Sequence, residues 1–273
     1  MFNDISHKDP FMSSIKSTAL VTGASTGIGA VYAKRLASRG YHLVLVARNI
    51  NQLETLAIEL RSDFGVQVDV LRADLTNAED LHQVEKRLRE DSSIRLLVNN
   101  AGTANKGSFI DADPDLMENL IDLNVLAVTR LTAAALQGML ARGEGDIINI
   151  ASVVGLAPEL PLGVYGATKS FVIALSQAIN AELGEKGIYV QAVLPAATRT
   201  DIWERAGRDI NDVQGVMDVE EMVDAALVGF DRRETVTIPP LHDESLWRTY
   251  DAARQALLPH FVEEHAADRY QVK

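Results

Sequence analysis

Two residues four positions apart, Tyr165 and Lys169, have side chains that together could transfer a proton. On a helix, residues i and i+4 lie on one face, so both side chains can face the same cleft. A free tyrosine, with a pKa of about 10, exchanges protons poorly at neutral pH, and a nearby ammonium group is expected to lower that pKa. Such a pair could protonate the oxygen of a ketone during its reduction. An ordinary helix can also place two polar residues at this spacing.

A second chemical signal is the glycine-rich stretch TALVTGASTGIGA, which contains Gly23, Gly27 and Gly29 between an apolar run and a helical pattern. Glycines let the backbone approach a pyrophosphate, and the N-terminus of the following helix offers N–H groups and a positive dipole. The spacing is G-x-x-x-G-x-G rather than G-x-G-x-x-G, and such turns also occur for purely geometric reasons. Its position after the first apolar run favours a nucleotide site.

The end of the next apolar run, LVLVARN, bears on the type of dinucleotide. An acidic residue there would bind the ribose 2′-hydroxyl, whereas an arginine accommodates a 2′-phosphate. Ala47 is not acidic, and Arg48 supplies a planar guanidinium group that suits phosphate. NADP(H) is therefore expected in preference to NAD(H), with an ordinary surface arginine as the alternative.

Seven nearly all-apolar runs alternate with helical patterns along the chain. Such runs are typical of strands covered on both faces, and parallel neighbours require long right-handed crossovers. The pattern predicts an α/β fold, namely a single doubly wound Rossmann-type domain with a seven-stranded, mainly parallel sheet and helices on both faces. The strands are expected at 18–23, 41–47, 66–73, 94–102, 146–152, 188–195 and 234–239, and helices at 28–39, 50–62, 77–90, 114–141 and 165–184.

No linker divides residues 17–273, which are expected to form this one domain after a flexible N-terminal arm of residues 1–16. A C-terminal helical extension is expected from about residue 242. Its apolar face is expected to pack against the domain, and a substrate lid is the alternative. That face contains Leu246, Tyr250, Ala253 and Leu257.

Composition narrows the possible partners and chemistry. Acidic residues outnumber basic ones by 38 to 26, and no Lys/Arg-rich run occurs, so neither nucleic acid nor a membrane is expected as a partner. The chain has no cysteine, which excludes thiol nucleophiles and zinc-thiolate sites, and no metal site is expected. The N-terminus lacks the apolar core of a secretion signal, and no apolar run approaches the roughly 18 residues that span a bilayer. The cytoplasm is the expected compartment.

Taken in order, five stretches resemble the short-chain dehydrogenase/reductase superfamily from residue 18 to about residue 200. The resemblance implies that Tyr165 is the general acid/base, that Lys169 also binds the nicotinamide ribose, and that Ser152 holds the substrate oxygen. It implies that Asn124 supports a water-linked proton relay from a slightly irregular helix. Taken singly, Ser152 and Asn124 are more readily explained as structural hydrogen-bonding residues, but the ordered set of four indicates catalysis. The stretches are TGASTGIG, NNAG (99–102), DLNVLA, NIASVVG and YGATK.

The same resemblance implies a set of cofactor contacts. Asp74 matches the acidic residue that contacts adenine, and the turn at residues 100–102 lies beside the cofactor. After the sixth strand the family usually reads Pro-Gly, whereas this chain has Ala196 in place of the glycine, so the backbone path beside the nicotinamide is open to question. The expected cofactor-binding residues are Gly23, Ser25, Thr26, Gly27, Ile28, Gly29, Arg48, Asp74, Leu75, Asn100, Ala101, Gly102, Tyr165, Lys169, Pro195, Thr198 and Thr200.

The substrate is expected above Ser152 and Tyr165, between residues 153–163 and the segment 201–217. This largely apolar lining favours a hydrophobic ketone or aldehyde, or the matching secondary alcohol, with hydride transfer to or from NADP(H). One alternative is a reductase of 3-oxoacyl thioesters, for which Lys106, Arg199 and Arg208 offer few basic groups. Another is a non-catalytic NADP-sensing protein, which would not need the acid/base pair. The expected pocket residues are Val154, Leu156, Leu162 and Trp203.

Two long predicted helices, 114–141 and 165–184, carry more apolar surface than one sheet face needs. In this family such helices pair across a two-fold axis, so the resemblance implies a homodimer or homotetramer. Core packing is the alternative explanation.

Overall fold

The computed structural model describes residues 17–104, 109–110, 112–160, 162–201, 203 and 209–270. The expected N-terminal arm, together with Lys106 and Arg208, lies outside these described residues. The chain divides into two compact units, with the boundary between Pro239 and Pro240.

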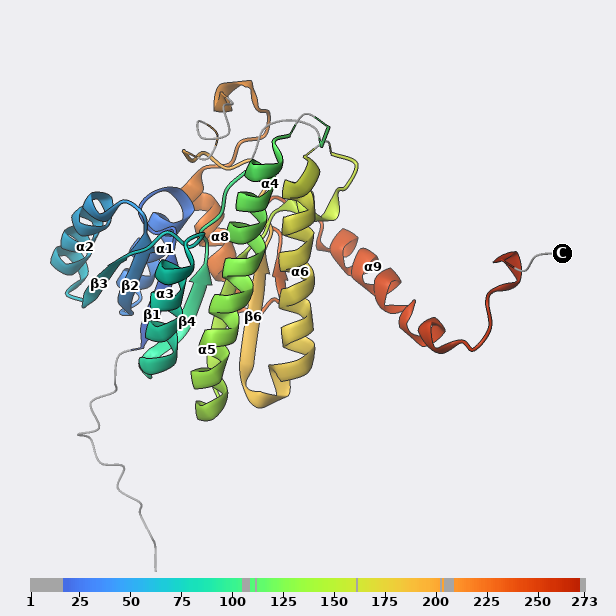
Figure 1. Ribbon diagram of the computed structural model, residues 1–273, viewed down its shortest axis with the longest axis horizontal. Coiled ribbons are helices and arrows are strands. Elements are labelled where there is room, and N and C mark those ends of the chain that lie inside the picture. The colour runs from blue at the N-terminus through green and yellow to red at the C-terminus, as the bar shows by residue number, and fades with distance from the viewer. Residues whose placement is uncertain are drawn as a thin grey trace, which may run out of the picture. The chain divides into compact units, whose positions relative to one another are not determined.

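The larger unit contains one sheet of seven strands in the order β3-β2-β1-β4-β5-β6-β7 (Figure 1). Every pair of neighbours is parallel, so the sheet is all-parallel rather than mainly parallel, and the doubly wound α/β prediction is confirmed. The strand order reverses between β1 and β4, and ligands bind such folds at the carboxyl ends of the strands beside this point. The strands are β1 (Thr18–Thr22), β2 (His42–Ala47), β3 (Val68–Arg72), β4 (Ile94–Asn99), β5 (Gly145–Ile150), β6 (Ile188–Val193) and β7 (Val236–Thr237).

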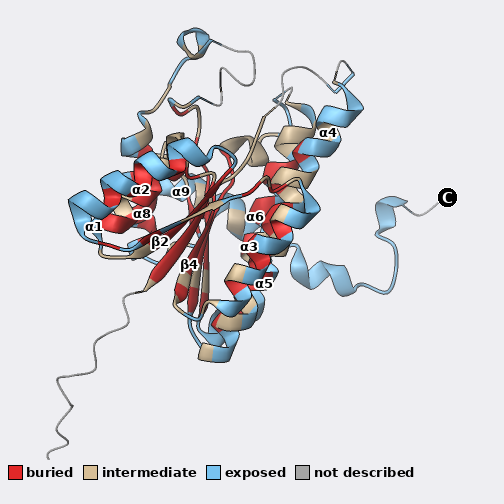
Figure 2. Cartoon of the chain, turned by 60° about the vertical axis from the view of Figure 1, so that its left-hand side comes forward, coloured by how far each residue is buried: buried red, intermediate tan, exposed pale blue. Residues whose placement is uncertain are grey.

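Helices cover both faces of this sheet, as the all-apolar strands require. On one face, α1 (Gly27–Ser38), α2 (Ile50–Phe64) and α8 (Val219–Asp231) enclose one apolar cluster. On the other, α3 (Ala78–Glu90), α5 (Val128–Arg142) and α6 (Gly163–Leu183) enclose a second. In Figure 2 the labelled strands are buried, and the helices are buried only on the side that faces the sheet.

One helical run continues from Pro114 to Arg142 through α4 (Pro114–Ile121), a π-helical segment (Asp122–Ala127) and α5. The Asp113 side chain caps its start by accepting a hydrogen bond from the Asp115 N–H (3.0 Å). The run is long and apolar enough to cross a membrane by length and composition, which differs from the expectation that no segment would be. Because α5 packs against α3, β4 and β5, the fold itself accounts for that apolar character.

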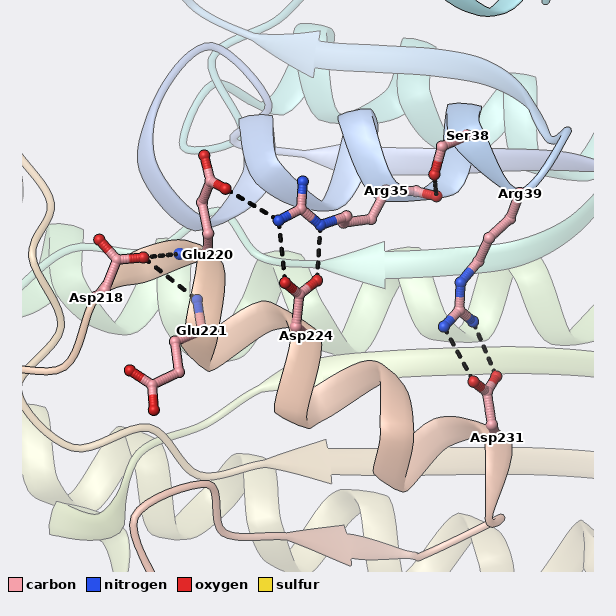
Figure 3. Close-up of polar contacts among 8 residues, drawn as sticks. All are labelled: Arg35, Ser38, Arg39, Asp218, Glu220, Glu221, Asp224 and Asp231. Carbon is pink, nitrogen blue, oxygen red and sulfur yellow. Dashed lines mark hydrogen bonds and ion pairs between the residues drawn. The ribbon is translucent and has the colours of Figure 1, made fainter.

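An ion-pair network joins α1 to α8, which lie side by side (Figure 3). The Arg35 guanidinium donates two hydrogen bonds to the Asp224 carboxylate (2.6 and 3.0 Å) and one to Glu220 (3.0 Å). One turn further, Arg39 donates two hydrogen bonds to Asp231 (2.8 and 3.0 Å). Paired guanidinium and carboxylate planes fix orientation as well as distance, so this network holds α8 in a defined position against α1.

The smaller unit contains α9 (Glu244–Gln255) and the 3₁₀ turns Leu258–Val262 and Asp268–Tyr270. No described residue in 240–270 is buried, and Leu246, Tyr250 and Leu257 on the predicted apolar face are all exposed. The unit therefore does not bury this face within itself.

Candidate active site

A cavity of about 470 Å³ lies at the carboxyl ends of the parallel strands of the larger unit. It brings together residues from distant parts of the chain that the sequence assigned to cofactor and catalysis. The predicted residues that line it are Gly23, Ser25, Thr26, Gly27, Ile28, Arg48, Asp74, Leu75, Asn100, Ala101, Gly102, Ser152, Tyr165, Lys169, Pro195, Thr198, Thr200 and Trp203.

The glycine turn after β1 is built for close backbone approach. Gly23 adopts φ +64°, and a Cβ atom there would lie 2.8 Å from Asn100 Nδ2. Gly29 does not line the cavity, but a Cβ atom there would lie 2.3 Å from the Gly23 carbonyl oxygen, so this glycine lets α1 pack onto the turn. The first turn of α1 carries no acidic residue, and its N-cap residue makes no capping hydrogen bond. The turn and the helix N-terminus therefore fit a pyrophosphate.

Hydrogen bonds hold the ends of β1 and β4 together beside this turn. Asn100 donates from Nδ2 to the Thr22 carbonyl oxygen (2.8 Å), and the Thr22 hydroxyl accepts from the N–H groups of Asn100 and Ala101 (3.0 Å each). The NNAG stretch thus shapes the wall of the cavity, as the resemblance implied.

At the end of the cavity that was predicted to bind adenosine, Arg48 and Asp74 lie 3.9 Å apart (Arg48 Nη1 to Asp74 Oδ2). Burial raises the pKa of Asp74, but the two hydrogen bonds from Thr76 and the charges of Arg48 and Arg72 outweigh it, so the pKa lies below its usual value. The Arg48 side chain is 69% exposed and can still reach a ligand at the cavity edge. Asn49 and Gln52 also line this edge and were not predicted.

Ser152 and Tyr165 meet at the other end of the cavity. The Ser152 hydroxyl donates to the Pro195 carbonyl oxygen (3.2 Å) and accepts from the Val154 N–H (3.4 Å). Burial of the phenol raises the pKa of Tyr165, and a hydrogen bond with Ser152 partly offsets the rise. Lys169 was expected to lower this pKa, and that expectation is wrong, because burial of the phenol disfavours the phenolate and raises the pKa of Tyr165.

Lys169 is buried, with 6% of its surface exposed. Its Nζ donates to the Ile150 carbonyl oxygen (2.9 Å) and lies 5.7 Å from the centre of the Tyr165 ring. Burial lowers the pKa of Lys169 to about 8. Near neutral pH the group is therefore a buried cation directly below the tyrosine ring.

Asn124 lies in the π-helical segment, which agrees with the irregular helix that the resemblance implied. The side chain is buried and does not line the cavity. Its Nδ2 donates to the Thr103 carbonyl oxygen (2.9 Å) and the Thr168 hydroxyl (3.2 Å), and its Oδ1 accepts from the Thr103 N–H (3.0 Å). A π-helical turn commonly marks a functional site. Here it places Asn124 between Thr103, in the loop after β4, and Thr168 on α6, the helix that also carries Lys169.

Two backbone hydrogen bonds to Met217 hold the turn after β6 in place. Thr198 and Met217 form a parallel bridge, in which the Arg199 N–H donates to the Met217 oxygen (3.0 Å) and the Met217 N–H donates to the Ala197 oxygen (2.9 Å). Among the described non-glycine residues only Arg233 has a positive φ, so the turn does not need a glycine at position 196.

The substrate end differs in part from expectation. Trp203 lines the cavity and donates from Nε1 to the Thr198 carbonyl oxygen (2.7 Å). Val154, Leu156 and Leu162 do not line it. Residues of the long helical run take part instead, and their spacing of four on an amphipathic helix was the signal that could have revealed them. The unpredicted lining residues here are Asn119, Leu123, Ile150, Ala151, Ala196 and Asp201.

Comparison with solved structures gives two close matches. A short-chain dehydrogenase from Sphingobium yanoikuyae, in complex with NADPH, is 56% identical, with a TM-score of 0.92 over 93% of this chain and 100% of that one. A bulky-bulky ketone specific alcohol dehydrogenase from Comamonas testosteroni is 53% identical, with a TM-score of 0.87 over 94% of this chain and 99% of that one.

Curated relatives are more distant and longer. A very-long-chain 3-oxoacyl-CoA reductase from Anas platyrhynchos is 40% identical over 182 residues, which is 65% of this chain and 58% of the relative. The human 17-beta-hydroxysteroid dehydrogenase type 3 is 35% identical over 193 residues, 70% of this chain and 62% of the relative. The chain thus spans about three fifths of the length of these curated relatives. The family described as short chain dehydrogenase matches residues 17–211. With the glycine turn and the Ser-Tyr-Lys group in one cavity and the π-helical Asn124 packed behind it, this chain belongs to the short-chain dehydrogenase/reductase family.

Proposed function

We propose that this chain is an NADP(H)-dependent oxidoreductase that interconverts a hydrophobic ketone or aldehyde and the matching alcohol. The observation that carries the proposal is the single cavity that presents a pyrophosphate cradle at one end and Ser152, Tyr165 and Lys169 at the other. The bound nicotinamide would supply or accept the hydride, and the chain's own residues would handle the proton.

In reduction, the Tyr165 hydroxyl donates the proton to the substrate oxygen, and the Ser152 hydroxyl holds that oxygen in place. The raised pKa of Tyr165 keeps the phenol protonated before the reaction, as a proton donor requires. The buried Lys169 cation stabilises the phenolate that remains, because a charge in a poorly hydrated site acts strongly on its neighbour. In oxidation the same groups act in reverse.

The assignment is tested by Tyr165→Phe, which removes the proton donor and leaves the cradle unchanged. Turnover is expected to fall by at least ~10²-fold, in the range typical of lost acid/base catalysis, with NADPH affinity unchanged. Unchanged turnover would contradict this role of Tyr165, and an unaltered biological role without turnover would support the NADP-sensing alternative.

The preference for NADPH rests on Arg48 and on the absence of an acidic side chain at the end of β2. The Sphingobium relative was solved with NADPH. Arg48→Ala is expected to raise the KM for NADPH about 10- to 100-fold, the effect of losing a charged hydrogen bond of roughly 1.5–3 kcal/mol, and to leave the KM for NADH unchanged. Arg72→Ala is the matched control, because Arg72 is also exposed and near Asp74 but does not line the cavity.

A ketone with large apolar substituents is the proposed substrate class. Leu123, Ile150 and Trp203 supply apolar surface at the catalytic end, and the Comamonas relative is described as specific for bulky-bulky ketones. The curated 3-oxoacyl-CoA reductases favour a thioester instead, but Lys106, Arg199 and Arg208 are few basic groups for a phosphate-bearing carrier in a chain with 38 acidic and 26 basic residues. Rates with aryl ketones, with a 3-oxoacyl-CoA and with the matching free 3-oxo compound distinguish the two classes, and a strong preference for the CoA ester would contradict the proposal.

A homodimer or homotetramer is also proposed, formed through the helical run 114–142 and α6. This surface exposes large apolar side chains that the fold leaves uncovered in the single chain, and light scattering that gives a monomer at micromolar concentration would contradict the assembly. The side chains are Leu116, Ile121, Leu126, Leu140 and Phe171.

A further inference from the structure

Four polar side chains form a buried level in the apolar core beneath the catalytic residues. Asn99 on β4, Thr132 on α5, Asn149 on β5 and Ser176 on α6 are each 3% exposed or less. We refer to them as the polar layer. Buried polar groups in a core are costly unless they are hydrogen-bonded, so their presence calls for a physical reason.

Hydrogen bonds connect the members of the polar layer from one element to the next. Asn99 Nδ2 donates to the Thr132 hydroxyl (3.0 Å) and to Asn149 Oδ1 (2.9 Å). Asn149 Nδ2 donates to the Ser176 hydroxyl (2.9 Å), which in turn donates to the Val172 carbonyl oxygen (2.7 Å). Asn99 and Asn149 are also direct partners in the β4–β5 register. One continuous chain of bonds therefore runs through two strands and two helices.

On the helices, the polar layer lies about two turns below the catalytic level. Thr132 is eight residues after Asn124, and Ser176 is seven residues after Lys169. At about 1.5 Å per residue, these separations correspond to roughly 10–12 Å along the helix axes, on the same face as the catalytic residue.

The residue separations along β4 and β5 place the polar layer at the same depth below the catalytic residues. Asn149 comes three residues before Ser152, and Asn99 comes three residues before Gly102. Three residues of a parallel strand span about 10 Å. All four elements that carry the catalytic end of the cavity are thus bonded to one another at one common depth below it.

Apolar packing alone leaves the relative height of a helix on a sheet poorly determined, because hydrophobic contact is non-directional and tolerates repacking. Hydrogen bonds of 2.7–3.0 Å are directional, so a slide of about 1 Å by α5 or α6 would lengthen and tilt them and would be opposed by the layer. The catalytic contacts need this accuracy, since Lys169 must reach the Ile150 carbonyl oxygen and Asn124 must reach Thr168 across different elements.

We propose that Asn99, Thr132, Asn149 and Ser176 are positioning residues that set the height of α5 and α6 against β4 and β5. The layer thereby holds Lys169 and Asn124 in register with Ser152 and Tyr165. Its kinetic readout rests on the proposed reductase function, so the test also includes a measurement that needs no substrate.

The test compares two substitutions at one site. Thr132→Val removes the hydroxyl and keeps the volume, whereas Thr132→Ser keeps the hydroxyl and removes a methyl group. Ser176→Ala provides a second break in the layer. Ile148→Val is the control for the loss of a methyl group, because Ile148 is fully buried beside Asn149 on β5 but packs in the apolar cluster of the opposite sheet face.

We expect Thr132→Val and Ser176→Ala to lower kcat about 10- to 100-fold, the scale of a misplacement near 1 Å, with the KM for NADPH changed less than about twofold. Thr132→Ser and Ile148→Val are expected to keep kcat within about threefold, although each loses stability through a small cavity. If Thr132→Val and Ser176→Ala both kept the kcat of the wild-type protein, the proposal would be overturned. The polar layer would then have a structural role only.

The measurement without substrate is the ultraviolet titration of Tyr165, taken as the difference between each protein and its Tyr165→Phe derivative. We expect Ser176→Ala to change the titration midpoint of Tyr165 and Thr132→Ser to preserve it, because only the first breaks the bond between Asn149 and α6, the helix that carries Tyr165 and Lys169. If the wild-type protein shows no turnover but the titration midpoints of the two variants still differ, the proposed function would be refuted and the positioning role would stand. A midpoint in Ser176→Ala identical to that of the wild-type protein would refute the positioning layer.

Discussion

Replacement of Lys169 by methionine should make the protein inactive and change how its stability depends on pH. Burial lowers the pKa of Lys169 from 10.5 to about 8. Because one pKa unit corresponds to about 1.4 kcal/mol, keeping this group protonated at pH 7 costs the folded state on the order of 3 kcal/mol. Methionine has a similar volume and no charge, so the variant does not carry this cost.

The direction of the pH effect follows from proton binding. Between pH 8 and pH 10.5 the unfolded chain keeps the Lys169 proton and the folded protein releases it, so the unfolded state binds more protons. The free energy of unfolding of the wild-type protein therefore gains on the order of 3 kcal/mol across this window, relative to the variant. The loss of the hydrogen bond to the Ile150 carbonyl oxygen lowers the variant's stability by a similar amount at every pH, so it does not alter the slope.

The assay is urea unfolding of both proteins at several pH values from 7 to 10.5, with the difference between their free energies of unfolding plotted against pH. Subtraction removes every titration that the two proteins share. Lys34→Met is the matched control for the same substitution at a lysine that is 39% exposed on α1. A flat difference for Lys169→Met would show that the lysine is well hydrated in the folded protein and would refute the description of it as a buried cation.

Two further substitutions test parts of the fold that support the cavity. Arg39→Ala breaks the two hydrogen bonds to Asp231 and should lower the free energy of unfolding by about 1 kcal/mol or less, since both side chains are partly exposed, and the loss should shrink in 0.5 M NaCl. Gly29→Ala places a Cβ atom 2.3 Å from the Gly23 carbonyl oxygen, so calorimetry should show weaker NADPH binding and a lower melting temperature. Gly184→Ala, where a Cβ atom meets no atom within 4 Å, should leave both unchanged, and equal effects at the two glycines would contradict the close-approach argument.

Much of the fold was predictable because parallel strands covered on both faces must be apolar along their whole length. The run at 94–102 and its equivalents predicted all seven strands, and the predicted helix boundaries lie within two residues of those in the structure. Helix α8 was not predicted, although Asp218 at its N-cap was a readable signal. The glycine turn at one end of the cavity was predictable as well, since its glycines have a backbone role that leaves a direct mark on the sequence.

The parts that were not predictable depend on distances between elements. The pKa of Tyr165 is set by how much water surrounds the phenol, and residue spacing does not report hydration. Val154 and Leu156 follow a strand that ends at the site, but the 3₁₀ turn Val153–Leu156 carries them away from the cavity lining. The polar layer joins Asn99 to Asn149 and Ser176, 50 and 77 residues away in sequence, and no local pattern reveals such a match.

The bridge between Thr198 and Met217 makes the intervening segment an exchangeable module. Both ends of the segment are fixed to each other, and beyond Met217 the capped start of α8 is held against α1 through Arg35. Doubling the length of a loop whose ends are already joined costs only about 0.6 kcal/mol, so insertions here are thermodynamically tolerable. Grafting this segment from another family member would replace the cavity wall that contains Trp203, together with Thr200 beside Gly27, and would leave Ser152, Tyr165 and Lys169 unchanged. The same scaffold could in this way acquire a new substrate range by exchange of one segment.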